Sequence, residues 1–196
     1  MEHLKLIDEV IFTNRKAILQ RKAITIFLLF FIACVIGWIY EMLFYRIDTG
    51  EFIKRGQGFG PWLPIYGFGA LSIVVLTSKK KFSVTGIFLI SAVGSAIIEL
   101  IAGWALFTFG NGLRLWDYNT EIWNWGNIGG YVCIRSVLLF AIMGTLFYYL
   151  IIPKVTALAS KFKLSVLTAV TLPIAIIFFT DLIIGYLIKP FFAIVG

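Results

Sequence analysis

Five long apolar stretches constrain this chain more than any other feature. They cover about residues 23–45, 61–78, 84–109, 131–152 and 164–188. A helix rises about 1.5 Å per residue, so about 20 apolar residues cross the hydrocarbon core of a bilayer. With 60% hydrophobic and 14% charged residues and a mean hydropathy of +0.96, the chain lies outside the range of soluble domains. We therefore predict an all-α membrane protein with one five-span helical domain over residues 23–196.

The basic residues predict the orientation of these spans. Eleven of the 17 lysines and arginines lie in residues 1–22, in the Lys79–Lys81 run and in the loop at 153–163. All three segments fall on one side of a five-span bundle, and cytoplasmic loops are enriched in lysine and arginine. We predict a cytoplasmic N-terminus and an extracytoplasmic C-terminus, with Lys189 outside. The net charge of +7 is thereby explained by topology, and no nucleic-acid partner is expected.

Residues 1–22 have the pattern of a basic amphipathic helix. Apolar side chains recur at roughly helical spacing, with lysines and arginines between them. Such a helix is expected to lie on the cytoplasmic lipid headgroups. A helix that docks a partner protein would have the same pattern, so both interpretations stay open.

The stretch at 55–69, RGQGFGPWLPIYGFG, is an irregular entry into the second span. Glycine tolerates positive φ and close backbone approach, and proline removes a hydrogen-bond donor. Only residues 64–77 are uniformly compatible with a helix, which is short for a span. Either the helix begins near Pro61, or the glycine-rich part itself descends into the protein, or the stretch is a tight outer turn. The candidate binding residues here are Arg55, Gly58, Gly60, Pro61, Pro64 and Tyr66.

Four ionisable residues lie within the predicted spans, and depth counting places them at one level in the outer leaflet. Glu41, Glu99 and Asp181 each stand about 16–18 residues from a cytoplasmic end, which corresponds to about 24–27 Å. Arg135 lies about one turn below the outer end of its span. Intramembrane charges are costly and normally face the bundle interior, where they mark functional sites.

Small residues indicate that two of these carboxylates face neighbouring helices. Glu41 shares a row with Ala33 and Gly37, and Glu99 shares a row with Ser91, Ser95 and Gly103. Three acids and one base would leave uncompensated charge in a low dielectric. The cluster is therefore expected to hold protons, to bind a cation, or to recruit Arg55 or Arg114 from the loops. The alternative is a satisfied structural network in which one acid pairs with Arg135.

Several kinds of chemistry have no motif in this sequence. There is no G-x-x-x-x-G-K-[ST] phosphate-binding loop, and His3 is the single histidine. Cys34 and Cys133 form no CxxC or cysteine–histidine pattern. We predict no ATPase site in this chain, no metal, no cofactor and no catalytic residue.

Ordered motifs across the first four spans resemble a known family. They are GWIYE at 37–41, RG at 55–56, GPWLPIYG at 60–67, RLWDY at 114–118 and NIGGYVC at 127–133. This series is similar to that of the bacterial membrane proteins described as putative ABC-transporter type IV, or CmpB-like. Asn119 departs from the pattern, where a serine is expected. The resemblance implies a permease subunit that works with a separate ATPase, and it adds Arg114, Trp116, Asp117 and Asn127 to the candidate binding residues.

Three functions follow as hypotheses. The first is a transport component of the bacterial cytoplasmic membrane, a permease or substrate-binding subunit with an outer-leaflet site for a small solute or cation. The second is a membrane-embedded sensor, assembly or regulatory protein that docks a partner through its N-terminal helix. The third is an enzyme that acts on lipid headgroups, because carboxylates and Arg135 can do acid–base chemistry at that depth. Expected partners are the bilayer, an unidentified solute, and a separate ATPase or a second copy of the chain.

Overall fold

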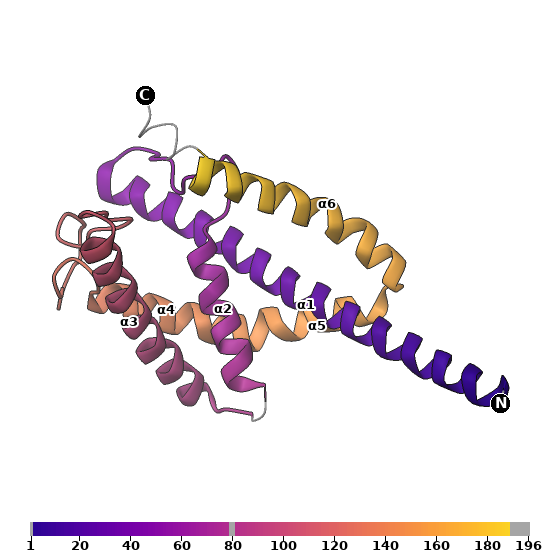
Figure 1. Ribbon diagram of the computed structural model, residues 1–196. Coiled ribbons are helices and arrows are strands. Elements are labelled where there is room, and N and C mark those ends of the chain that lie inside the picture. Colours follow the sequence, from indigo (N-terminus) through magenta and orange to yellow (C-terminus); the bar gives the residue numbers. More distant parts are fainter. Residues whose placement is uncertain (1, 79–80, 189–196) are drawn as a thin grey trace. The chain divides into compact units, whose positions relative to one another are not determined.

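The computed structural model describes residues 2–78 and 81–188, and this part of the chain is helical, with no strand (Figure 1). Lys79, Lys80 and Lys189, which entered the orientation argument, lie outside the described residues, as do the C-terminal end and the side chains of residues 1–13.

The described helices overlap the five predicted apolar stretches. They are α1 (Glu2–Thr49), α2 (Pro64–Thr77), α3 (Val84–Phe109), α4 (Ile134–Leu146), the π-helix η1 (Phe147–Ile151), α5 (Ile152–Lys161), α6 (Leu164–Leu182) and the π-helix η2 (Ile183–Ile188). Four stretches are long and apolar enough to cross a membrane, namely Asn14–Thr49, Val84–Phe109, Ile134–Lys161 and Leu164–Tyr186. Helix α2 has 14 residues, about 21 Å of helix, so a fifth span stays a prediction.

Two helix boundaries near prolines differ from the predicted ones. The fourth span was predicted to end at about residue 152, just before Pro153. This prediction is wrong, because the helix runs unbroken from Ile134 to Lys161. The π turn at Phe147–Ile151 widens the helix just ahead of the proline ring and accommodates its missing N–H. Helix α2 begins at Pro64 and not near Pro61, so only one proline lies in its first turn.

Helix α1 is unbroken across the boundary at residues 22–23 that separates the predicted interfacial segment from the first span. The placement of residues 1–22 on the headgroups stays a prediction. The chain divides into two compact units. Unit 1 comprises residues 1–40, 54–67 and 152–196, and unit 2 comprises residues 41–53 and 68–151.

Unit 1 is built on α1 and α6, which run beside each other (Figure 1). Near one end, the Gln20 amide donates to the Thr168 hydroxyl at 3.1 Å. Further along, the Phe178 ring is fully buried and makes edge-on contacts with Phe31 and Trp62, with ring centroids 5.6 and 5.5 Å away. Aromatic packing of this kind fixes the spacing of the two helices and brings Trp62 against them.

Unit 2 is built on α3 packed against α4. Helix α3 begins at a Ser83 cap and buries one row of residues at a spacing of four, which contains Ser91, Glu99 and Gly103. This is the face that the small residues predicted. Gly144 of α4 lies so close to Ser91 that an added Cβ would stand 2.8 Å from the serine Cβ. Close helix contact through small residues therefore carries Glu99 into the interior of unit 2.

Candidate functional site

The predicted site residues fall in both units. Unit 1 holds Arg55, Gly58, Gly60, Pro61, Pro64, Tyr66 and Asp181, and unit 2 holds Glu41, Glu99, Arg114, Trp116, Asp117, Asn127 and Arg135. The structure brings some of these residues together within each unit, as described next. A common site for all four ionisable residues stays a prediction.

In unit 1, the carboxylate of Asp181 holds the glycine-rich stretch. The backbone N–H of Phe59 donates to Oδ1 at 2.6 Å, and that of Gly60 donates to Oδ2 at 3.1 Å. The indole N–H of Trp62 donates to Oδ2 at 2.8 Å. Asp181 is buried, with 7% of its surface exposed. Three N–H donors converging on one carboxylate stabilise its charge and fix the loop to α6.

Glycine at two positions permits this approach. A Cβ on buried Gly58 would overlap the Asp181 carboxylate, and a Cβ on Gly185, one turn beyond Asp181, would lie 2.8 Å from the Gly58 backbone nitrogen. Both positions therefore exclude larger residues without movement of the loop. Asp181 anchors the loop, and this role was not predicted from the sequence.

The same stretch is attached to α1 where it enters α2. The Leu63 N–H donates to the Cys34 carbonyl at 3.0 Å, and the Tyr66 ring covers the face of Gly37. Leu63, Tyr66 and Gly67 are buried, whereas Pro61 is exposed and Arg55 and Pro64 are half-buried. The glycine-rich part is thus held on both helices of unit 1.

In unit 2, Glu99 lies in a buried polar network. Its side chain is 4% exposed, and the Tyr118 hydroxyl donates to Oε1 at 2.5 Å. The Ser136 hydroxyl donates to Oε2 at 2.8 Å. Ser136 comes from the first turn of α4, and Tyr118 comes from the loop between α3 and α4. Both oxygens of a carboxyl group inside an apolar helix pair are therefore paired, as buried polar groups require.

Arg135 pairs with Glu121, a loop residue that the sequence analysis did not select. The guanidinium donates to Oε2 of Glu121, and the Tyr45 hydroxyl donates to Oε1 at 2.5 Å. Glu121 is 8% exposed. The guanidinium lies over the Phe44 ring at 4.0 Å and the Tyr118 ring at 5.3 Å. The ion pair is thus covered by aromatic rings, which exclude water from it.

Glu41 is half-buried on α1 in unit 2, one turn before Tyr45. Residues four apart share a helix face, so Glu41 lies on the face that carries the Tyr45 contact to Glu121. We use "polar network" below for Glu99, Tyr118, Ser136, Glu121, Arg135 and Tyr45.

A second group of predicted residues organises the loop itself. Arg114 stacks between the rings of Phe107 and Tyr131, at 4.8 and 4.9 Å, and donates to Asp117 at 3.3 Å. Nearby, Asn127 accepts from the Gly130 N–H at 2.8 Å, and Gly130 has a φ of +80°. The Trp116 indole donates to the Tyr131 carbonyl at 2.8 Å. These contacts fix the backbone that carries Tyr118 and Glu121, so the motif residues here support the polar network.

A family model described as "Putative ABC-transporter type IV" matches residues 28–186, which include the polar network and the Asp181 contacts. The chain belongs to this family. No curated protein and no solved structure matches it. The family description and the four apolar helices together identify this ABC-transporter type IV chain as a membrane protein.

Among the described residues of this ABC-transporter type IV chain, no group of three or more histidines, cysteines, aspartates or glutamates is placed to hold a metal ion. The polar network can hold charge and protons at fixed atoms in a low-dielectric environment. Sequence reasoning did not select Glu121, Ser136 or Tyr45, and it named Tyr118 only as part of the RLWDY motif. One signal was available for Glu121, because a buried arginine needs a carboxylate partner and Glu121 follows the RLWDY motif by three residues.

The Tyr118 phenol gives a pH-dependent prediction. Burial, and then the charge of Glu99, raise its pKa well above the ordinary value of about 10. The folded chain therefore holds this proton more tightly than the unfolded chain does. Its contribution to stability is complete below about pH 10 and is lost as the pH rises further, by at most about 1.4 kcal/mol per pH unit.

We expect Tyr118→Phe to remove this component of alkaline destabilisation. The measurement is the free energy of unfolding in detergent from pH 9 to pH 12, for wild type and for the variant. Tyr149→Phe removes a hydroxyl from a more exposed tyrosine and is expected to retain the wild-type slope. If the free energy of unfolding fell with pH at the same rate in wild type and Tyr118→Phe, the raised pKa assigned to Tyr118 would be contradicted.

Proposed function

We propose that the protein is the membrane-embedded component of an ABC-type transport system, a permease or substrate-binding subunit. The observation that carries this proposal is the polar network, which is buried among apolar helices in a member of the ABC-transporter type IV family. Ionisable groups at such positions are costly, and they are retained where they serve a pathway or a site.

The charges of the network favour a cation or a cationic small solute. In the described part of unit 2 the network contains two carboxyl groups, Glu99 and Glu121, and one guanidinium, Arg135. If all were ionised, the network would carry one excess negative charge in a low dielectric. A bound cation or a proton would neutralise it, and an anionic solute would add to it. The solute class proposed here is therefore a small cation.

Transport in this family would need energy from outside the chain, because the sequence has no phosphate-binding loop. We assign that role to a separate ATPase subunit. We also propose the five-span topology with the N-terminus in the cytoplasm, in which the glycine-rich stretch dips into the membrane and completes the crossing that α2 begins. Two contacts support the dip, the one from Leu63 to Cys34 in the middle of the first span and the one from Phe59 to Asp181.

The test is solute uptake by cells that lack the native gene and carry a plasmid copy. We expect Glu99→Gln to reduce uptake of a cationic solute at least tenfold, because the change removes the charge and retains the shape. Glu51→Gln removes an exposed carboxylate of the same unit and is the matched control, expected to transport like wild type. Glu99→Gln protein that inserts at normal levels and transports like wild type would contradict the proposal.

A further inference from the structure

We propose that α1 and the turn between α5 and α6 together form a binding site for the phosphate headgroups of anionic phospholipids. The site lies in unit 1, at the end opposite Asp181 along α6. It is independent of the proposed transport function.

Arg21 and Gln20 join the two parts of this site. The Arg21 guanidinium donates to the Phe162 carbonyl at 2.9 Å and to the Ala159 carbonyl. Gln20 donates to Thr168 in the first turns of α6. Because Arg21 satisfies carbonyls at the C-terminal end of α5, it fastens the turn to α1 and complements the helix dipole there. The lysines on either side of the turn are thereby brought next to those of α1.

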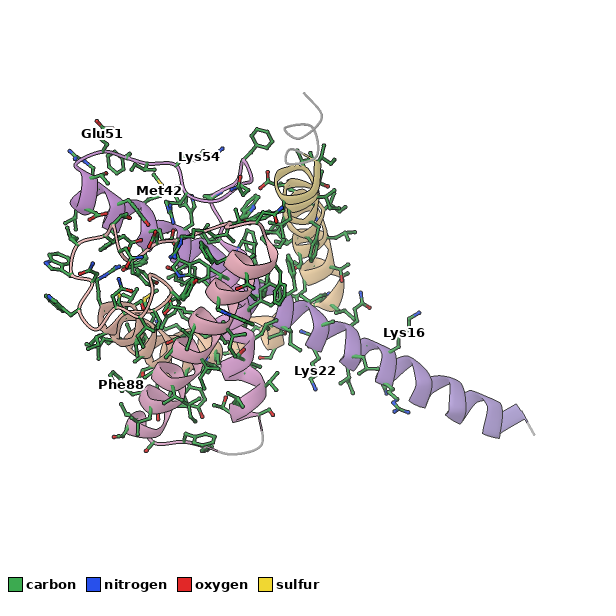
Figure 2. The ribbon with its side chains drawn as sticks, turned by 60° about the vertical axis from the view of Figure 1, so that its left-hand side comes forward. Lys16, Lys22, Met42, Glu51, Lys54 and Phe88 are labelled. Carbon is green, nitrogen blue, oxygen red and sulfur yellow. The ribbon has the colours of Figure 1, made fainter. Side chains whose placement is uncertain are left out.

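Exposed basic side chains surround this attachment. They are Arg15, Lys16, Lys22, Lys154, Lys161 and Lys163. No aspartate or glutamate occurs in residues 14–40 or 152–180, so no acidic side chain of these segments offsets them. Figure 2 shows Lys16 and Lys22 projecting from different sides of α1, so the positive charge is not confined to one face of the helix. Clusters of four to eight basic residues next to a span attract anionic lipids.

Apolar side chains at the same level favour a lipid over a soluble ligand. Ile18 and Leu158 are 67% and 57% exposed, and Phe162, which stands between Lys161 and Lys163, is 46% exposed. A membrane interface accommodates both kinds of group, since apolar side chains enter the acyl region while lysines extend to the phosphates. Free phosphate would use the lysines and leave the apolar groups in water.

The experiment measures binding of phosphatidylglycerol to the full chain in neutral detergent, by native mass spectrometry of a lipid titration. Near a surface each basic residue contributes about fivefold to binding, so we expect Lys161→Gln with Lys163→Gln to weaken phosphatidylglycerol binding about 25-fold. Lys54→Gln removes an exposed charge elsewhere in unit 1 and is expected to bind like wild type. Lys161→Arg with Lys163→Arg should retain binding, which separates charge from folding.

Phosphatidylcholine and inorganic phosphate are the competing probes. We expect neither to displace phosphatidylglycerol at equal concentration. Equal binding of phosphatidylcholine, displacement by inorganic phosphate, or wild-type binding by the double glutamine variant would each overturn the proposal. One further result would overturn it. If the double glutamine variant lost binding of a soluble protein but kept wild-type binding of phosphatidylglycerol, the face would be a protein-docking surface.

Discussion

Replacing Arg135 by methionine is expected to lower the free energy of unfolding by about 3–5 kcal/mol. The change retains much of the side-chain volume but removes the guanidinium that pairs with Glu121. The carboxylate is 8% exposed, accepts from the Tyr45 hydroxyl, and would remain charged in a low dielectric without its guanidinium partner. Breaking a buried pair from one side costs more than the pair itself contributes, and unfolding in mixed micelles measures the loss.

The double variant Arg135→Met with Glu121→Met isolates the electrostatic part of this effect. It removes both charges together, so it is expected to recover most of the lost stability, as buried pairs replaced by apolar residues often do. Arg46→Met is the matched control, because Arg46 is exposed over the Phe52 ring and should cost under about 1 kcal/mol. An Arg135→Met protein as stable as the Arg46→Met protein would show that the ion pair is not buried as described.

Asp181→Ala is expected to release the glycine-rich stretch from α6. The change leaves the N–H groups of Phe59 and Gly60 and the indole of Trp62 without their carboxylate acceptor. An unsatisfied donor costs about 1–3 kcal/mol when it is buried, and these three are partly buried, so a loss of about 3 kcal/mol is expected if the loop stays in place. A loop that detaches avoids this cost and becomes accessible.

Thiol labelling distinguishes a glycine-rich loop that stays in place from one that detaches. In a chain whose buried Cys34 and Cys133 are replaced by alanine, a cysteine is introduced at Leu63, which is 7% exposed. An impermeant thiol reagent should react with it at least tenfold faster after Asp181→Ala than in the parent. Thr180→Ala changes an exposed neighbour on α6 and should leave the rate unchanged. Equal rates in all three proteins, together with unchanged stability, would contradict the anchoring role of Asp181.

The long helices were predictable because an apolar stretch must become a helix to satisfy its backbone in a membrane. The third span was predicted at 84–109, and α3 has these bounds. The buried face of α3 was also predictable, since Ser91, Ser95, Glu99 and Gly103 recur every four residues along the helix. Pro153 was misread because a π turn upstream lets the helix continue, and the sequence pattern carries no signal for such a turn.

The partners of the buried charges were less predictable than their positions. Spacing placed Glu99 on an inward surface, and depth counting placed Arg135 near the outer end of its span. Glu121 and Tyr118 reach them from an irregular loop whose path depends on positive-φ glycines such as Gly130. Asp181 was assigned to the solute site chiefly on its depth. Two of its three contacts are with the backbone N–H groups of Phe59 and Gly60, which every residue type except proline supplies, and so the side-chain sequence could not identify them.

Cation binding by the purified full chain tests the central claim most directly. The unfolding temperature in detergent is measured against a panel of small inorganic and organic cations, for wild type, Glu99→Gln and the exposed-site control Glu51→Gln. The account predicts that at least one cation raises the unfolding temperature of wild type and of Glu51→Gln by several degrees and has no effect on Glu99→Gln. Equal stabilisation of all three proteins, or of none by any cation, would contradict a cation site at the polar network.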